Sequence, residues 1–216
     1  MRDRVYIAIA GNIGAGKSTL VDFLCRTYGV QPFFEPNEHN PYLEDFYEDM
    51  KAWSFHSQVF FLSHKFRIHQ ALDKTPGVVV QDRTIYEDAE IFATALHQMG
   101  KMSDRDFRTY QELYQTICMS LREPDLLIYL KCPIRTLRKR IRLRGRAMEQ
   151  DIPVSYLKRL HILYEEWMVR YREEGKGEIL ELDTERLEYL TDLVHRIDVM
   201  QRIEKYLPKP ELKNCS

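Results

Sequence analysis

Short apolar runs alternate with longer amphipathic segments along this chain. The runs are rich in Val, Ile and Leu, and this pattern is typical of buried strands. The predicted strands lie at residues 5–10, 30–35, 77–81, 125–131 and 178–182, the last being the weakest. Because parallel strands need long crossovers, segments of this length between strands favour parallel pairing. The pattern predicts an α/β fold, a parallel sheet wrapped by helices.

The segments between the strands carry apolar residues at helical spacing. Residues 17–28 place Leu20, Phe23 and Leu24 on one side, and Gly29 ends the predicted helix. Further helices are predicted at residues 41–50, 53–74, 84–99, 104–122, 133–144, 153–174 and 185–206. We expect one domain over residues 1–207 and a loosely held tail at 208–216, which has two prolines and little apolar content.

Composition narrows the classes of partner. The chain has 32 basic and 33 acidic side chains, so it has no overall attraction for nucleic acid or a membrane surface. No apolar run approaches the ~20 residues of a membrane-spanning helix, and the first strand begins too early to leave room for a targeting peptide. The four cysteines lack metal-ligand spacing. We therefore expect a cytoplasmic protein with reduced thiols and no nucleic-acid or membrane partner.

The strongest chemical signal directly follows the first strand. It fits the phosphate-loop pattern of glycine, four residues, glycine, lysine and serine or threonine. The loop comprises Gly11, Asn12, Ile13, Gly14, Ala15, Gly16, Lys17, Ser18 and Thr19. Lys17 can reach the β- and γ-phosphates, and the Ser18 hydroxyl can ligate magnesium. Because a strand delivers the loop and a helix leaves it, the sequence predicts a nucleoside triphosphate site.

Charged residues also end two other predicted strands, at the edge of the sheet where open α/β folds bind ligands. Glu35 ends the second strand, and Asp82 and Arg83 follow the third. One carboxylate there can orient magnesium through water, and another can take a proton from an attacking hydroxyl. A lone carboxylate at a strand end more often caps a helix. The neighbouring phosphate loop favours the catalytic interpretation.

Cations are concentrated at residues 135–146. Helical spacing places Arg140 and Arg144 on one face and Arg146 on another, so at least one pair can face a phosphate group. We predict an arginine-rich lid, at about residues 140–152, that closes over the transferring phosphoryl group and excludes water.

These features, in this order, resemble the deoxyribonucleoside kinase family from Val5 to about Leu182. The family motifs appear here as Gly11 to Ser18, Glu35-Pro36, Trp53-Ser54-Phe55, Asp82-Arg83-Thr84 and Arg140-x-x-x-Arg144-Gly145-Arg146. Asp82 with Tyr86-Glu87-Asp88 is more similar to the bacterial deoxyadenosine, deoxyguanosine and deoxycytidine kinases than to the animal enzymes. The resemblance implies a phosphate-loop kinase fold with a five-stranded parallel sheet, and a homodimer.

The resemblance also implies roles for individual residues. Glu35 would be the base for the 5'-hydroxyl, Arg83 would steady Glu35 and the substrate, and Asp82 would act on Mg²⁺ through water. Lys17, Arg140 and Arg144 would stabilise the phosphoryl oxygens of ATP, with Arg146 as a further lid arginine. The deoxynucleoside would be bound by Tyr47 and Glu149 at the 3'-hydroxyl, by Gln58 and Phe92 at the base, and by a pocket that Lys65 and Asp88 define.

The resulting prediction is ATP-dependent phosphorylation of a deoxynucleoside to its 5'-monophosphate in nucleotide salvage. Asp88 as a carboxylate only accepts hydrogen bonds, so adenine, guanine and cytosine, with their exocyclic amines, are favoured over thymine. A nucleoside monophosphate kinase of the thymidylate kinase type shares the loop and lid, but its ionised acceptor prefers arginine to the acidic segment at Glu35. A non-catalytic structural homologue is the other alternative, because fold alone never guarantees activity.

Overall fold

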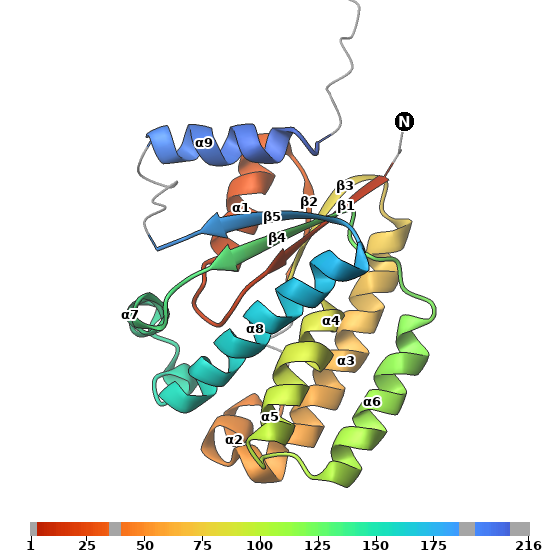
Figure 1. Cartoon of the computed structure of the whole chain (residues 1–216), viewed down its shortest axis with the longest axis vertical. Helices are drawn as coiled ribbons and strands as arrows, with labels where there is room; N and C mark the ends of the chain where they lie inside the picture. Colours follow the sequence, from red (N-terminus) through yellow and green to blue (C-terminus); the bar gives the residue numbers. More distant parts are fainter. Residues whose placement is uncertain (1–3, 35–39, 186–192, 208–216) are drawn as a thin grey trace, which may run out of the picture.

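The computed structural model describes residues 4–34, 40–185 and 193–207, and within them a five-stranded sheet carries helices on both faces (Figure 1). All four strand pairs are parallel, in the order β2-β3-β1-β4-β5. The strands are β1 (Arg4–Ala10), β2 (Gln31–Phe33), β3 (Gly77–Asp82), β4 (Leu126–Lys131) and β5 (Glu178–Asp183). The predicted α/β fold and parallel sheet are confirmed.

The central strand β1 is buried from Val5 to Ala10, as expected for a strand that is covered on both faces. Its last residues pair with the ends of both neighbours, Ile9 with Asp82 of β3 and Ala10 with Tyr129 of β4. Three carboxyl ends therefore meet at one edge of the sheet, where the chain order reverses and where ligands of such folds bind.

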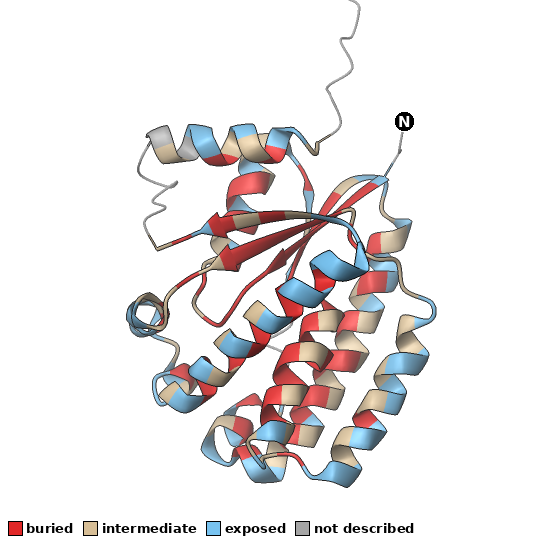
Figure 2. Cartoon of the chain, in the orientation of Figure 1, coloured by how far each residue is buried: buried red, intermediate tan, exposed pale blue. Residues whose placement is uncertain are grey.

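Helices cover the two faces of the sheet unequally. One face carries α1 (Lys17–Tyr28) and α9 (Leu193–Glu204). The other carries α3 (Met50–Lys74), α4 (Ile85–Glu87), α5 (Thr94–Gln98) and α8 (Val154–Glu174), with α2 (Leu43–Glu48) and α6 (Asp104–Cys118) further out. The remaining helix, α7 (Ile134–Arg144), follows β4. Figure 2 shows the buried residues gathered on the sheet and on the helix faces toward it.

Two boundaries differ from the sequence prediction for identifiable reasons. The predicted helix at 53–74 begins earlier, at Met50, because the Asp49 side chain accepts hydrogen bonds from the N–H groups of Lys51 and Ala52 and caps it. The predicted helix at 84–99 is divided by a π-helical segment, Asp88–Ala93, between α4 and α5. Such wide turns recur at functional sites because they shift the faces of a helix.

Other predicted segments are shorter in the structure. The second strand spans only Gln31–Phe33, since its pairing with β3 stops at Gln81. The helix at 104–122 ends at Cys118, and the helix at 41–50 is confined to Leu43–Glu48. The tail at 208–216 and the start of the predicted helix at 185–206 lie outside the described residues.

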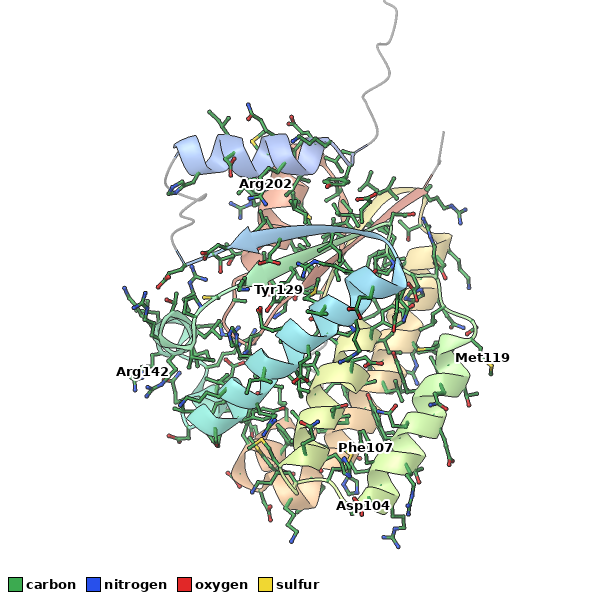
Figure 3. All side chains as sticks on the ribbon, viewed as in Figure 1. Asp104, Phe107, Met119, Tyr129, Arg142 and Arg202 are labelled. Atoms are coloured by element: carbon green, nitrogen blue, oxygen red, sulfur yellow. The ribbon has the colours of Figure 1, made fainter. Side chains whose placement is uncertain are left out.

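Polar side chains connect the sheet to a helix on each of its faces (Figure 3). Arg202 of α9 donates to the carbonyl of Glu181 on β5 at 2.5 Å, and Tyr129 of β4 donates to Glu165 of α8 at 2.9 Å. At the far end of α6, Met119 is 83% exposed. A search of the described helices for one long and apolar enough to cross a membrane finds none.

Candidate active site

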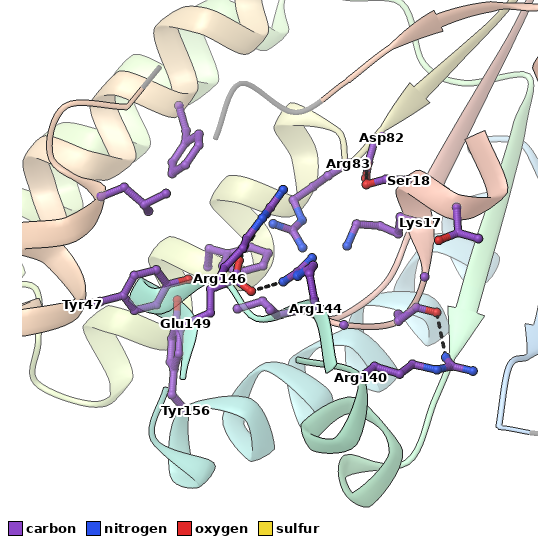
Figure 4. Close-up of a pocket in the computed structure, with 18 of the residues that line it drawn as sticks. Lys17, Ser18, Tyr47, Asp82, Arg83, Arg140, Arg144, Arg146, Glu149 and Tyr156 are labelled. Carbon is purple, nitrogen blue, oxygen red and sulfur yellow. Dashed lines mark hydrogen bonds and ion pairs between the residues drawn. The ribbon is translucent and has the colours of Figure 1, made fainter. Parts of the chain in front are cut away.

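A cleft of about 730 Å³ opens at the carboxyl ends of β1 and β3 (Figure 4). It is lined by the phosphate loop, by residues of α2, α3, α7 and α8, and by the π-helical segment. Of the predicted site residues it contains Ile13, Gly14, Ala15, Gly16, Lys17, Ser18, Thr19, Tyr47, Gln58, Asp82, Arg83, Asp88, Phe92, Arg140, Arg144, Arg146 and Glu149. Among these described residues five are cations and three are carboxylates, which favours an anionic ligand.

The phosphate loop has the geometry that the motif predicts. Gly14 and Gly16 have φ angles of 82° and 100°, in a backbone region that residues with a side chain rarely adopt. The Lys17 ammonium donates to the carbonyls of Gly11 at 2.9 Å and Asn12 at 3.3 Å. The loop thus holds its lysine through two of its own carbonyls, and helix α1 starts at that lysine. The first turn of α1 lines the cleft with Lys17, Ser18 and Thr19, and the N–H groups of a first helical turn form a site that favours phosphate.

Ser18 and Asp82 meet between the loop and β3. The Ser18 hydroxyl donates to Asp82 Oδ2 at 2.5 Å. The buried Asp82 Oδ1 has no hydrogen-bond partner among the described residues. These are hard oxygen donors of the type that Mg²⁺ prefers, so the residues fit the metal that the family resemblance implies.

Arg83 occupies an unusual backbone conformation at the end of β3. Its φ angle is 60°, and its N–H donates to the carbonyl of Ile9 at 3.1 Å. Its guanidinium carbon lies 4.4 Å from the centre of the Phe92 ring, a cation–π contact. A non-glycine residue in this region costs energy that the surrounding structure must offset, and such strain clusters at active sites.

The inner end of the cleft carries groups that can recognise a base. Asp88 and Phe92 belong to the π-helical segment, and Gln58 comes from α3. The buried Gln58 Oε1 has no hydrogen-bond partner among the described residues. Lys65 does not line the cleft but lies behind Asp88, to which it donates at 3.0 Å. Its predicted contribution to the pocket is therefore indirect.

The arginines of the predicted lid divide into two groups. Arg144 and Arg146 both form ion pairs with Glu149, which lies in the 3₁₀ turn Ala147–Glu149 that follows α7. Arg140 instead donates to the carbonyls of Ala15 at 3.2 Å and Thr184 at 2.6 Å, beside the phosphate loop. Figure 4 shows Lys17, Arg83 and Arg144 pointing into the same space from three different elements.

The structure brings most of the predicted residues together, with three exceptions. Gly11 and Asn12, the first two residues of the loop, are buried and do not line the cleft, and the Asn12 amide donates to the Leu157 carbonyl on α8 at 3.1 Å. Lys65 is the third residue away from the cleft surface. Glu35 lies outside the described residues.

Some lining residues were not predicted from the sequence. Leu43 and Phe46 of α2 and Tyr156 of α8 line the cleft, but each looks like an ordinary core residue in its helical pattern. Burial raises the pKa of Tyr156 well above its usual range, so its hydroxyl stays protonated and can donate a hydrogen bond. No local signal distinguishes Tyr156 from the other buried tyrosines of the same helix.

Comparison with known proteins places these observations in a family. Residues 7–208 match the sequence model of the family described as deoxynucleoside kinase. The deoxyadenosine/deoxycytidine kinase of Bacillus subtilis is 42% identical over 164 residues, covering 75% of this chain and 76% of that protein. The deoxyadenosine kinase of Lactobacillus acidophilus is 32% identical and covers 93% and 95%. The structure of M. mycoides deoxyadenosine kinase with its products dCMP and dCDP superimposes with a TM-score of 0.82, at 28% identity, covering 94% of this chain and 100% of that one.

Proposed function

The chain belongs to the deoxynucleoside kinase family, and we propose that its cleft transfers the γ-phosphoryl group of ATP to the 5'-hydroxyl of deoxyadenosine, deoxyguanosine or deoxycytidine. One observation carries this proposal. The phosphate loop with Lys17 shares a single cleft with Gln58, Asp88 and Phe92, which offer hydrogen bonds and a ring face to a base. The donor and acceptor therefore meet in one cavity.

The reaction requires few covalent contributions from the protein. The 5'-oxygen forms a bond to the γ-phosphorus, the bond from that phosphorus to the bridging oxygen breaks, and ADP leaves. Glu35, two residues after β2, takes the hydroxyl proton. Lys17, Arg83 and Arg144 stabilise charge on the phosphoryl oxygens, and Arg140 and Arg146 complete a lid that excludes water.

Ser18 and Asp82 would hold Mg²⁺, with the serine hydroxyl as a ligand and the carboxylate acting through water. Bound there, the ion would neutralise charge on the donor phosphates. The Ser18–Asp82 hydrogen bond keeps the two oxygens 2.5 Å apart.

The base preference follows from hydrogen-bonding capacity. The Gln58 amide can both donate and accept, whereas Asp88 as a carboxylate only accepts. Together they favour a base edge with an exocyclic amine, which adenine, guanine and cytosine have and thymine lacks. Tyr47 and Glu149 line the cleft and would bind the 3'-hydroxyl of the sugar.

A substrate panel tests this proposal. Purified protein is incubated with ATP, Mg²⁺ and each of the four deoxynucleosides, their ribose forms and thymidine monophosphate. We expect monophosphates from deoxyadenosine, deoxyguanosine or deoxycytidine, and poor turnover of thymidine. Phosphorylation of thymidine monophosphate alone would favour the thymidylate kinase type instead. Light scattering on the same protein tests the expected homodimer, and fractionation of the source cells tests the expected cytoplasmic location.

A further inference from the structure

One carboxylate near the site has no role in the proposed chemistry. Glu87, the last residue of α4, has no exposed surface and does not line the cleft. Buried carboxylates are costly unless hydrogen bonds satisfy them. Glu87 lies directly behind the phosphate loop, where it contacts the Gly11 N–H.

The Glu87 side chain joins two segments that are distant in sequence. Oε1 accepts from the Gly11 N–H at 3.2 Å and from the Tyr164 hydroxyl at 2.8 Å. Oε2 accepts from the Thr84 N–H at 2.7 Å and from the Thr84 hydroxyl at 3.2 Å. All these donors are neutral, so both oxygens are engaged without a cation.

The two segments carry opposite halves of the proposed reaction. Gly11 begins the phosphate loop, and its carbonyl oxygen accepts a hydrogen bond of 2.9 Å from the Lys17 ammonium. Thr84 directly follows Arg83, whose backbone is held at a φ of 60°. Gly11 also leaves no room for a side chain, because a Cβ there would lie 3.0 Å from the Leu130 carbonyl oxygen.

This site requires a carboxylate, not an amide. Each oxygen of Glu87 accepts from two donors. A glutamine would turn an NH₂ group toward one of these pairs, so that donor faces donor and a buried backbone N–H loses its acceptor.

We propose that Glu87 is a positioning residue for phosphoryl transfer, which holds the Gly11 end of the phosphate loop in register with the Arg83–Thr84 backbone. The inference rests on the proposed function. Loss of the carboxylate leaves the ligand-contacting groups in place but loosens the alignment of Lys17 with Arg83. Misplacement by about 1 Å can cost roughly 100-fold in rate.

The test compares Glu87→Gln with Glu90→Gln, the same chemical change three residues later at a half-buried ion pair with Arg170. Circular dichroism gives the folded fraction, and steady-state kinetics give kcat and KM per folded molecule. We expect Glu87→Gln to lower kcat by about 100-fold with the KM for deoxynucleoside changed less than about threefold. Glu90→Gln should resemble the wild type. A kcat of Glu87→Gln within about threefold of the wild type overturns the proposal.

A second variant covers failure of Glu87→Gln to fold. Tyr164→Phe removes a hydroxyl that lies 2.8 Å from Glu87 Oε1 and 2.9 Å from the Gly11 carbonyl oxygen, and it leaves the carboxylate in place; we expect kcat to fall about 3- to 10-fold. Non-additive effects in the double variant would support a shared action through Gly11, and an unchanged kcat in folded Tyr164→Phe would overturn the proposed role of Glu87.

If the wild type phosphorylates no deoxynucleoside, the proposed function fails separately. Slow ATP hydrolysis by the same proteins then decides: a loss of about tenfold or more in Glu87→Gln supports the role of Glu87, and a smaller change refutes it.

Discussion

The ammonium of Lys65 and the carboxylate of Asp88 form an ion pair of 3.0 Å in which both side chains are withdrawn from solvent. Asp88 lines the cleft, and Lys65 supports it from within α3. The acceptor group of the proposed base pocket is thus fixed by a cation that does not line the cleft. A buried pair of this kind is sensitive to loss of one partner, because the other charge stays buried without compensation.

Replacing one member of this pair should destabilise the fold. We expect Asp88→Asn to lower the free energy of unfolding by about 3 kcal/mol and the double variant Lys65→Met with Asp88→Leu to recover much of that loss. Urea denaturation followed by circular dichroism measures both. Arg170→Met, which breaks the half-buried pair with Glu90, is the matched control and should cost under about 1 kcal/mol. Equal losses in Asp88→Asn and this control would contradict the prediction.

The contact between Arg83 and Phe92 should affect catalysis. The cation–π interaction is worth about 0.5–2 kcal/mol, so Phe92→Leu should lower kcat/KM about 2- to 30-fold, beyond any loss of base stacking. Phe92→Tyr keeps the ring face over which Arg83 lies and should retain most of the activity. Steady-state kinetics on both variants provide the comparison, and equal activity in the two would argue against the contact.

Replacement of the proposed base should separate chemistry from binding. We expect Glu35→Gln to lower kcat by about 100-fold or more while the affinity for ATP stays within about twofold, because general-base loss acts on the transfer step. Glu38→Gln, in the same acidic segment, is the control and should stay active. Turnover of Glu35→Gln at the wild-type rate would exclude this assignment.

Gly14 packs directly against α7, the helix that carries Arg140 and Arg144. A Cβ at Gly14 would lie 3.0 Å from Ile141 Cγ1 and from the Leu137 carbonyl oxygen of α7. Gly14→Ala should therefore displace α7 and lower kcat/KM for ATP about tenfold, in addition to about 1–2 kcal/mol of backbone strain.

The control for this variant is Gly29→Ala. Gly29 also has a positive φ, 65°, but no atom lies within 4 Å of its hypothetical Cβ. It should lose a similar amount of stability, measured by thermal unfolding, with kinetics unchanged. If both variants keep wild-type kinetics, the packing of Gly14 on α7 has no part in catalysis.

Stability should depend on pH through His69, at the opposite end of the sheet. Burial is the main cause that lowers the pKa of this imidazole from its ordinary value of 6.5; nearby Arg122 lowers it further and Asp73 opposes the change. The neutral ring accepts the Arg122 N–H at 3.1 Å. Since the unfolded chain binds the proton more readily, stability is full above about pH 6.5 and falls as the pH drops toward the folded-state pKa.

The measurement is urea unfolding at pH 7.5 and 5.5. We expect the wild type to lose stability at the lower pH and His69→Gln, which keeps an acceptor for the Arg122 N–H, to lose less. His56→Gln, at an exposed position of α3, should behave like the wild type. An identical pH dependence in the wild type and His69→Gln would refute the assignment to His69.

The parts of the site that were predictable are those encoded by local spacing. The phosphate loop from Gly11 to Thr19 is recognisable because its glycines, lysine and serine stand at fixed spacing in one continuous segment. The helix Lys17–Tyr28 follows the prediction to the residue, since the loop sets its start and Gly29 its end. Arg140, Arg144 and Arg146, which line the cleft, were evident for the same reason, as a concentration of charge in one segment.

Other features depend on contacts between distant segments. Glu87 forms a capping box with Thr84, a contact within one short segment; only the fold brings Gly11 and Tyr164 to the same carboxylate. The sequence likewise cannot distinguish Tyr156, which lines the cleft, from Tyr164, which lies behind the loop, because both have the spacing of core residues in α8.

The sequence by itself determined the order of strands and helices, the phosphate loop and the kind of chemistry at the strand ends, because periodicity and motif spacing act over neighbouring residues. Tertiary structure alone decided that Lys65 pairs with Asp88 behind the cleft, that Arg140 lies against Ala15 and Thr184, and which buried groups contact the loop. The reason is physical: these are pairings between side chains whose proximity depends on packing, and packing is a property of the whole fold.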